Sequence, residues 1–185
     1  MYKENNIEPD KTIASLLCAA IISDTLFFRS PTCTWVDELT AKELAKIAEL
    51  DLKELAANMF KAGSDLKGKS AEEICYQDFK QFAAGEVKFG VGQVNCMSSE
   101  EIDEIDKIMM PYLEQVVKKQ KLDMVFFMLT NVMEVGTELL CCGKNAKELA
   151  IKAFKLPEDT EKIYLQDVVS RKKQLIPAFV VSLQQ

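Results

Sequence analysis

The chain has 185 residues, of which 48% are hydrophobic and 28% are charged, a balance typical of a globular protein with an apolar core. Its net charge of −6 argues against nucleic acid as a partner. The sequence contains no histidine, which excludes a Ser-His-Asp or Cys-His catalytic centre within these residues.

The first predicted element is built on an apolar stretch, residues 12–28, in which Asp24 is the only charged side chain. A helix that is apolar on every face belongs in a protein interior. A buried Asp24 must then be paired, hydrogen-bonded or bound to a cation. Ser-Pro-Thr-Cys-Thr, residues 30–34, is predicted to break this helix. From the residues alone, Asp24 either caps a local group near the rim of the core or binds a ligand.

Helix-start signals organise the rest of the N-terminal part. Asp10 is the predicted N-cap of the helix that contains Asp24, a second helix follows Thr34, and Asp51 caps a third. The segment 63–69 is short and polar and contains two glycines, so it is the predicted domain boundary. The candidate apolar positions of the second helix are Trp35, Val36, Leu39, Leu44 and Ile47.

Beyond the boundary, strands alternate with helices, which predicts an α/β domain. Capping residues at Ser70 and Ser98 open two helices, and Asn145 is a possible cap for a third. The predicted strands are 86–94, 124–129, 136–142 and 163–169, and Pro177 lies in the first turn of a last helix. The second and third strands are joined by too short a link for a helical crossover, so the sheet is predicted to be mixed.

One apolar helical stripe and six cysteines complete the pattern. The stripe consists of Ile102, Ile105, Met109, Leu113 and Val116. The cysteines are Cys18, Cys33, Cys75, Cys96, Cys141 and Cys142. They have no Cys-x-x-Cys spacing, so they do not predict a structural zinc site. Free thiols, with no signal segment and no apolar stretch of membrane-spanning length, favour a cytoplasmic protein that does not enter a membrane.

Three cations follow the last predicted strand in Ser-Arg-Lys-Lys-Gln, residues 170–174. A run of this kind is often a charged surface turn, but it can also bind an anion. Arg171 is one of only two arginines, and a guanidinium is the better fork for phosphate oxygens. From the residues alone, both interpretations stay open.

Two motifs carry a family resemblance. AAIISDTLFFRSPTCT, residues 19–34, resembles the metal-ligand segment of the manganese-dependent, family II inorganic pyrophosphatases of the DHH phosphoesterase superfamily. SRKKQLIP, residues 170–177, resembles the phosphate-binding signature of the same family. The resemblance runs over essentially the whole chain. The Asp-His-His stretch that names the superfamily is absent, so the chain is interpreted as the C-terminal part of such an enzyme.

The resemblance implies three regions: a helical remnant of the DHH catalytic domain at 1–62, a linker at 63–69 and a DHH-associated substrate-binding domain at 70–185. It implies that Asp24 is a metal ligand and that Lys80, Arg171 and Lys172 bind substrate. Lys173 is left out of the site, because on an extended backbone it would point away from Lys172.

The activity implied is the hydrolysis of pyrophosphate to two orthophosphates by a two-metal mechanism. The metal is manganese, with magnesium or cobalt possible, and the intact enzyme is expected to be a homodimer. Since Asp24 is the only ligand matched by the motif, these residues alone are expected to be inactive. Two alternatives stay open: an exopolyphosphatase of the same superfamily, and a non-catalytic, anion-binding regulatory module.

Overall fold

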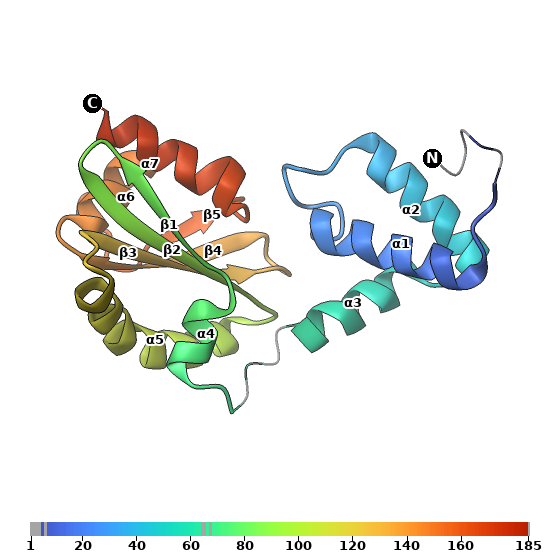
Figure 1. Ribbon diagram of the computed structural model, residues 1–185, viewed down its shortest axis with the longest axis horizontal. Coiled ribbons are helices and arrows are strands. Elements are labelled where there is room, and N and C mark those ends of the chain that lie inside the picture. The colour runs from blue at the N-terminus through green and yellow to red at the C-terminus, as the bar shows by residue number, and fades with distance from the viewer. Residues whose placement is uncertain (1–4, 6, 64–65, 67, 185) are drawn as a thin grey trace. The chain divides into compact units, whose positions relative to one another are not determined.

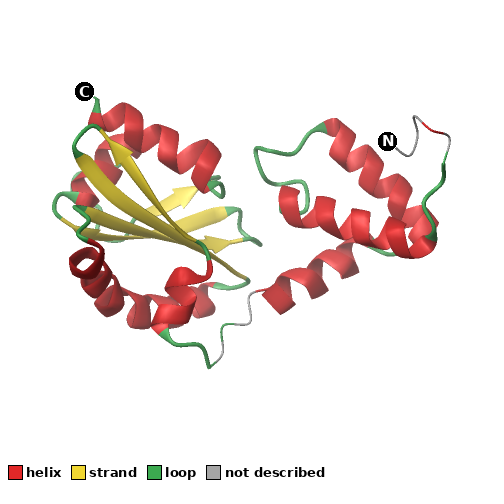
Figure 2. Cartoon of the chain, in the orientation of Figure 1, coloured by secondary structure: helices red, strands yellow, loops and turns green. Residues whose placement is uncertain are grey.

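The computed structural model describes residue 5, residues 7–63, residue 66 and residues 68–184. The chain divides into two compact units, Met1–Gly63 and Ser64–Gln185 (Figure 1). The first unit is helical, and the second combines strands with helices (Figure 2). Within the predicted linker at 63–69, positions 64, 65 and 67 lie outside the described residues.

Each helix of the helical unit begins at a side-chain cap. Asp10 accepts a hydrogen bond from the backbone N–H of Ile13 at 2.9 Å, and Asp51 accepts one from that of Glu54 at 2.9 Å. Thr34 forms a capping box with Asp37. The predicted caps at Asp10 and Asp51 are therefore confirmed. The three helices are α1 (Lys11–Thr25), α2 (Trp35–Ala48) and α3 (Leu52–Gly63).

The expectation that α1 is buried on every face is wrong for this unit. Its buried residues, Ala14, Cys18, Ile22 and Thr25, form a single stripe at helical spacing. α2 and α3 pack on α1, so one side of α1 is covered. On the opposite side, Leu16 is 63% exposed.

The predicted apolar face of α2 is also largely uncovered. Of the candidates named from the sequence, only Leu44 is buried, and Trp35 at the start of the helix is 76% exposed. The residues of α2 that do pack inward are mostly small: Ala41, Ala45 and Ala48. The core of this unit is accordingly narrow.

The second unit is built on a mixed five-stranded sheet in the order β1-β2-β3-β4-β5. β2 and β3 are parallel, while the other neighbouring pairs are antiparallel, which confirms the predicted mixed sheet. β1 was not predicted as a strand. The strands are β1 (Phe79–Ala84), β2 (Val87–Cys96), β3 (Met124–Asn131), β4 (Gly136–Gly143) and β5 (Tyr164–Gln166).

Helices cover both faces of this sheet (Figure 1). One face packs against α4 and α5, and the predicted apolar stripe of α5 is buried there. The other face packs against α6 and α7, with Phe89, Phe126 and Phe179 at its centre. β3 is buried along its whole length, as expected of a central strand. These helices are α4 (Ala71–Gln77), α5 (Ser99–Gln120), α6 (Ala146–Phe154) and α7 (Ile176–Leu183).

Two local predictions in this unit need correction. β5 has only three residues, and Arg171–Leu175 forms a π-helical turn that leads into α7. Asn145 occupies the N-cap position of α6, but it has a left-handed backbone and its side chain makes no capping hydrogen bond. Over the residues that are described, no helix has the length and apolar character required to cross a membrane.

Candidate functional site

Asp24 lies in the last turn of α1, and its side chain is exposed. The turn that follows has an unusual backbone, because Leu26, Phe27 and Phe28 all have positive φ, at 47°, 54° and 68°. Bulky residues rarely adopt this conformation, since it is sterically costly, and such positions cluster at functional sites. The sequence pattern did not reveal this feature.

Polar side chains hold this strained turn in place. The Thr25 hydroxyl donates to the backbone oxygen of Ile21 at 2.7 Å and accepts from the backbone N–H of Phe28 at 3.1 Å. Ser30 and Thr32 share a hydroxyl contact of 2.8 Å, and the Thr32 hydroxyl donates to the backbone oxygen of Asp24 at 3.3 Å. The residues after Asp24 thus fix the backbone that presents its carboxylate.

Asp24 offers a type of ligand that manganese binds, but it is a single ligand, and a manganese site needs several. A carboxylate oxygen is a ligand that hard divalent cations accept. In the described part of the chain, however, no three His, Cys, Asp or Glu side chains lie close enough together to hold a metal ion. Asp24 could therefore supply one ligand of a site whose other ligands are not among these side chains.

The second candidate site is the π-helical turn Arg171–Leu175. Hydrogen bonds of Ser170, its N-cap, and of Gln174 fix the shape of the turn. The Ser170 hydroxyl accepts from the backbone N–H of Lys173 at 3.3 Å. The Gln174 side-chain oxygen accepts from the backbone N–H groups of Val169 and Ser170, both at 2.9 Å, and its amide nitrogen donates to the backbone oxygen of Asp167 at 2.6 Å. Ser170 and Gln174 therefore shape the turn that carries the three cations.

Arg171 points inward from this turn. Its Nη1 donates to the backbone oxygens of Asp78, at 2.8 Å, and Val91, at 3.1 Å, while its Nη2 donates to Asp78 Oδ1 at 2.8 Å. The Arg171 side chain is only 8% exposed. A buried guanidinium requires such partners. Sequence reasoning missed Asp78 as a partner, because 93 residues separate it from Arg171.

Strand pairing brings Lys80 close to Arg171. Lys80 lies on β1 opposite Val91 of β2, and Val91 is the residue whose carbonyl oxygen binds Arg171. The side chains of Lys80 and Lys172 are both exposed. Lys80 and Arg171 therefore lie at one corner of the sheet unit, where Asp78 contacts Arg171, and Lys172 follows Arg171 in the same turn.

The reason for leaving out Lys173 is wrong. In a π-helical turn, Lys172 and Lys173 follow each other around a helix and do not point to opposite sides of an extended strand. Both side chains are exposed. The backbone therefore gives no ground for separating them.

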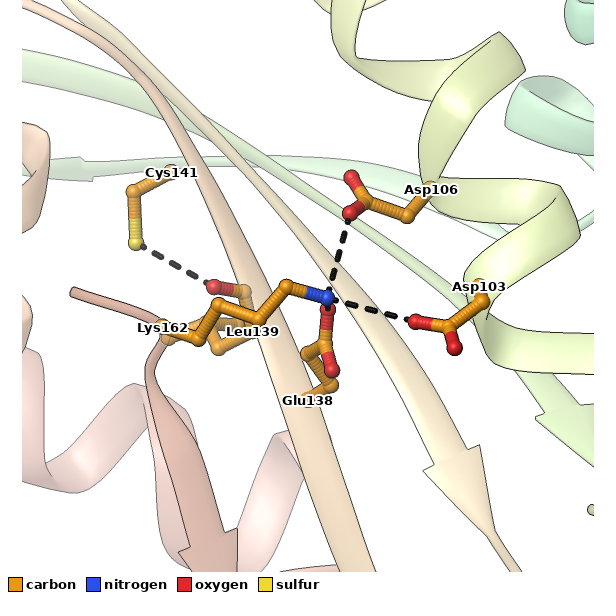
Figure 3. Close-up of polar contacts among 6 residues, drawn as sticks. All are labelled: Asp103, Asp106, Glu138, Leu139, Cys141 and Lys162. Carbon is orange, nitrogen blue, oxygen red and sulfur yellow. Dashed lines mark hydrogen bonds and ion pairs between the residues drawn. The ribbon is translucent and has the colours of Figure 1, made fainter. Parts of the chain in front are cut away.

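Another charged cluster surrounds Lys162 (Figure 3). Its Nζ lies 3.1 Å from Glu138, 3.3 Å from Asp103 and 3.6 Å from Asp106. The hydrogen bond to Glu138 raises the pKa of Lys162, and desolvation opposes this only in part. Nearby, burial raises the pKa of Cys141 to about 12. Lys162 and Cys141 are therefore both protonated at neutral pH, and neither is a nucleophile. The cluster ties β4 to α5.

Comparison with known proteins identifies the family of this chain. Residues 57–180 match the DHHA2 domain family. A cobalt-dependent inorganic pyrophosphatase of Clostridium perfringens is 44% identical over 176 residues, which cover 95% of this chain and 32% of that protein. A manganese-dependent inorganic pyrophosphatase of Bacillus subtilis is 41% identical over 177 residues, which cover 96% of this chain and 57% of that protein.

A solved structure gives the same result for the fold. A Methanococcus jannaschii protein assigned to the family II inorganic pyrophosphatases matches with a TM-score of 0.83 and 35% identity, covering 96% of this chain and 58% of that one. The chain thus spans less than two thirds of the length of these relatives. The resemblance expected from the two motifs is confirmed, and the chain belongs to the DHHA2 domain family.

Proposed function

We propose that this chain is the phosphate-binding portion of an inorganic pyrophosphatase, which hydrolyses pyrophosphate to two orthophosphates. The observation that carries the proposal is that Lys80 and Arg171 lie together at Val91 and Asp78 in the sheet unit, with Lys172 next to Arg171 in the same turn. The names of the manganese- and cobalt-dependent relatives support pyrophosphate as the substrate and a divalent transition metal as the cofactor.

The three cations suit a substrate with several negative charges. Arg171 can bind two phosphate oxygens through one planar edge, whereas Lys80 and Lys172 act as point charges on flexible stems. Backbone oxygens hold Arg171 before the substrate arrives. Together with the two lysines, it would neutralise charge that builds on the phosphoryl oxygens as the P–O bond breaks.

Asp24 would supply one carboxylate ligand to the metal. When bound, a pair of divalent ions supplies a hydroxide nucleophile at neutral pH and polarises the phosphoryl oxygens. One carboxylate cannot hold such a pair, so in this proposal the remaining ligands come from polypeptide outside these 185 residues. The strained turn after α1 keeps the backbone of Asp24 in one position.

A phosphate-release assay tests the ligand count. The purified 185-residue chain should release no phosphate from pyrophosphate above a chelator control, with manganese, cobalt or magnesium present. Metal-dependent turnover by this chain alone would contradict the assignment of the missing ligands to other polypeptide.

A chimaera tests the activity and the role of Asp24. These residues would replace the matching 57% of the Bacillus subtilis relative. The chimaera should hydrolyse pyrophosphate with manganese, and Asp24→Asn should weaken manganese binding and greatly reduce turnover. Glu104→Gln, which removes an exposed carboxylate on α5, is the matched control and should have no effect. Unchanged manganese affinity in Asp24→Asn would return Asp24 to a structural role.

The same chimaera tests the cations. Arg171→Lys keeps the charge but loses the planar fork, so it should lower the rate on the order of 10²–10³-fold, the usual loss for one preorganised donor. Lys80→Ala and Lys172→Ala should raise KM for pyrophosphate, while Lys107→Ala, at an exposed lysine of α5, should not. Polyphosphate offered as a second substrate separates a pyrophosphatase from an exopolyphosphatase. A harmless Arg171→Lys substitution would remove Arg171 from the site.

A further inference from the structure

We infer that Asp78 is a positioning residue of the anion site. Asp78 accepts hydrogen bonds from Nη1 and Nη2 of Arg171 and leaves one edge of the guanidinium free to bind a phosphate. The inference rests on the proposed function, because it concerns how the pyrophosphate site is preorganised. The substrate-binding residues implied by the family resemblance were Lys80, Arg171 and Lys172, and Asp78 was not among them.

Arg171 has more hydrogen-bond donors than its protein partners occupy. A guanidinium has five N–H donors in one plane. Both donors of Nη1 and one donor of Nη2 bind Asp78 and Val91. Within the described residues, no contact engages Nε–H or the second Nη2–H of Arg171. These two donors lie side by side on one edge of the plane, which is an arrangement that binds two phosphate oxygens at once.

Asp78 lies at a fixed point of the sheet unit. It is the C-cap residue of α4 and directly precedes β1, so it belongs to the frame of the sheet unit. It contributes both its backbone oxygen and its carboxylate to Arg171. The same backbone oxygen accepts from the N–H of Gln93 on β2 at 3.2 Å, which fixes its direction. Lys80 follows two residues later.

The charge of Asp78 makes the inference testable. Asp78 places a negative charge among cations that are to bind an anion, which by electrostatics alone weakens anion binding. Removal of the carboxylate would leave the 8%-exposed Arg171 with only its two hydrogen bonds from Nη1 to backbone oxygens, so Nη2 would lose its partner and the guanidinium would be less firmly oriented. Electrostatics and positioning therefore predict opposite signs for the same substitution.

The test is calorimetry of inorganic pyrophosphate binding to the 185-residue chain. If Asp78 positions Arg171, Asp78→Ala should weaken binding about tenfold, the loss expected when a charge-assisted hydrogen bond is removed. Asp78→Asn keeps an oxygen acceptor at the same position, so it should lose less. If both variants instead bind pyrophosphate as tightly as the unsubstituted chain, or more tightly, the inference is wrong.

A second readout reports on the guanidinium itself. Because Arg29 and Arg171 are the only arginines, the side-chain Nε–H region of a ¹⁵N spectrum should hold two signals, and Arg29→Lys identifies them. Pyrophosphate should shift the Arg171 signal in the unsubstituted chain, and Asp78→Ala should reduce that response. An undiminished response in a folded Asp78→Ala variant would overturn the inference.

The remaining outcomes distinguish failure of the proposed function from failure of the role given to Asp78. Far-UV circular dichroism verifies folding, and if Asp78→Ala does not fold, the Asp78→Asn variant carries both measurements. If the unsubstituted chain binds no pyrophosphate, both the proposed function and this inference fail. If Lys80→Ala weakens binding while Asp78→Ala does not, the proposed anion site stands and only the role of Asp78 is rejected.

Discussion

The helical unit and the sheet unit are built from similarly apolar segments but bury them to different extents. In the sheet unit, helices cover both faces, and the largest buried side chains include Phe89, Phe126, Phe127 and Phe179. The buried residues in the core of the helical unit are mostly alanines, with Cys18, Ile22 and Leu44, and larger side chains such as Phe60 pack against them only partly buried. Its exposed large apolar residues are Ile7, Leu16, Leu17, Trp35, Val36, Leu39 and Ile47.

This difference indicates where stability resides and how each candidate site is supported. The hydrophobic contribution scales with the apolar area removed from water, so the sheet unit should be the more stable. Arg171 is held by hydrogen bonds to the frame of that unit. Asp24, in contrast, lies on a thinly packed unit and depends on the local contacts of Thr25 and Thr32.

The largest expected effect comes from separating the units. Ser64–Gln185 expressed alone should unfold cooperatively in urea, whereas Met1–Gly63 alone should show little cooperative unfolding, because its core is narrow. Far-UV circular dichroism against urea concentration measures both. The comparison breaks down if the helical unit alone has the higher midpoint.

A matched pair of core and surface truncations should give the next largest difference. Phe127 is fully buried, so Phe127→Ala should lower the free energy of unfolding of the sheet unit by about 3–5 kcal/mol. Leu16, on the uncovered side of α1, is 63% exposed, so Leu16→Ala should change that of the helical unit by less than about 0.5 kcal/mol. Denaturant titration of each variant checks this. A large cost for Leu16→Ala would show that its side chain is covered in solution.

Two glycines should respond in opposite directions. Gly143 ends β4 with φ of +105°, and an added Cβ would lie 2.3 Å from the backbone oxygen of Asp123. Gly143→Ala should therefore destabilise the sheet unit by about 1–3 kcal/mol. Gly63 ends α3 with no atom near its Cβ position, so Gly63→Ala should stabilise the helical unit by up to about 1 kcal/mol. Thermal unfolding compares the two variants. A destabilised Gly63→Ala variant would contradict the expectation that the Cβ position of Gly63 is open and helical.

The smallest expected effect concerns the Lys162 cluster. Since its contacts raise the pKa of Lys162, their stabilisation is fully present below the pKa of an unfolded lysine, about 10.4, and is lost as pH rises through the folded value. The Lys162 side chain is 59% exposed, so Lys162→Met should cost up to about 1 kcal/mol at neutral pH.

Melting temperatures at neutral and strongly alkaline pH measure this difference, with Lys107→Met as the control on the exposed side of α5. The cost of Lys162→Met should shrink at high pH and at high salt. If the stability loss of Lys162→Met depends on neither pH nor salt, it arises from lost packing of the aliphatic part of the Lys162 side chain.

The sequence by itself determined the features that depend on near neighbours in the chain. Caps such as Asp10, Ser70 and Ser98 satisfy N–H groups within four residues, so their residue types are sufficient to place the helix starts. The buried stripe of α5 follows from helical periodicity, and the short link between β3 and β4 was enough to predict a mixed sheet. The two motifs identified the family because each is a continuous run of residues that can be recognised without the tertiary structure.

The tertiary structure decided what depends on distant partners. β1 exists because it pairs with β2, and α1 is half exposed because α2 and α3 cover only one of its sides. Arg171 is buried against Asp78, from which 93 residues of chain separate it. No local pattern encodes such a contact, because the energy that favours it appears only once the sheet has brought the two ends of this unit together.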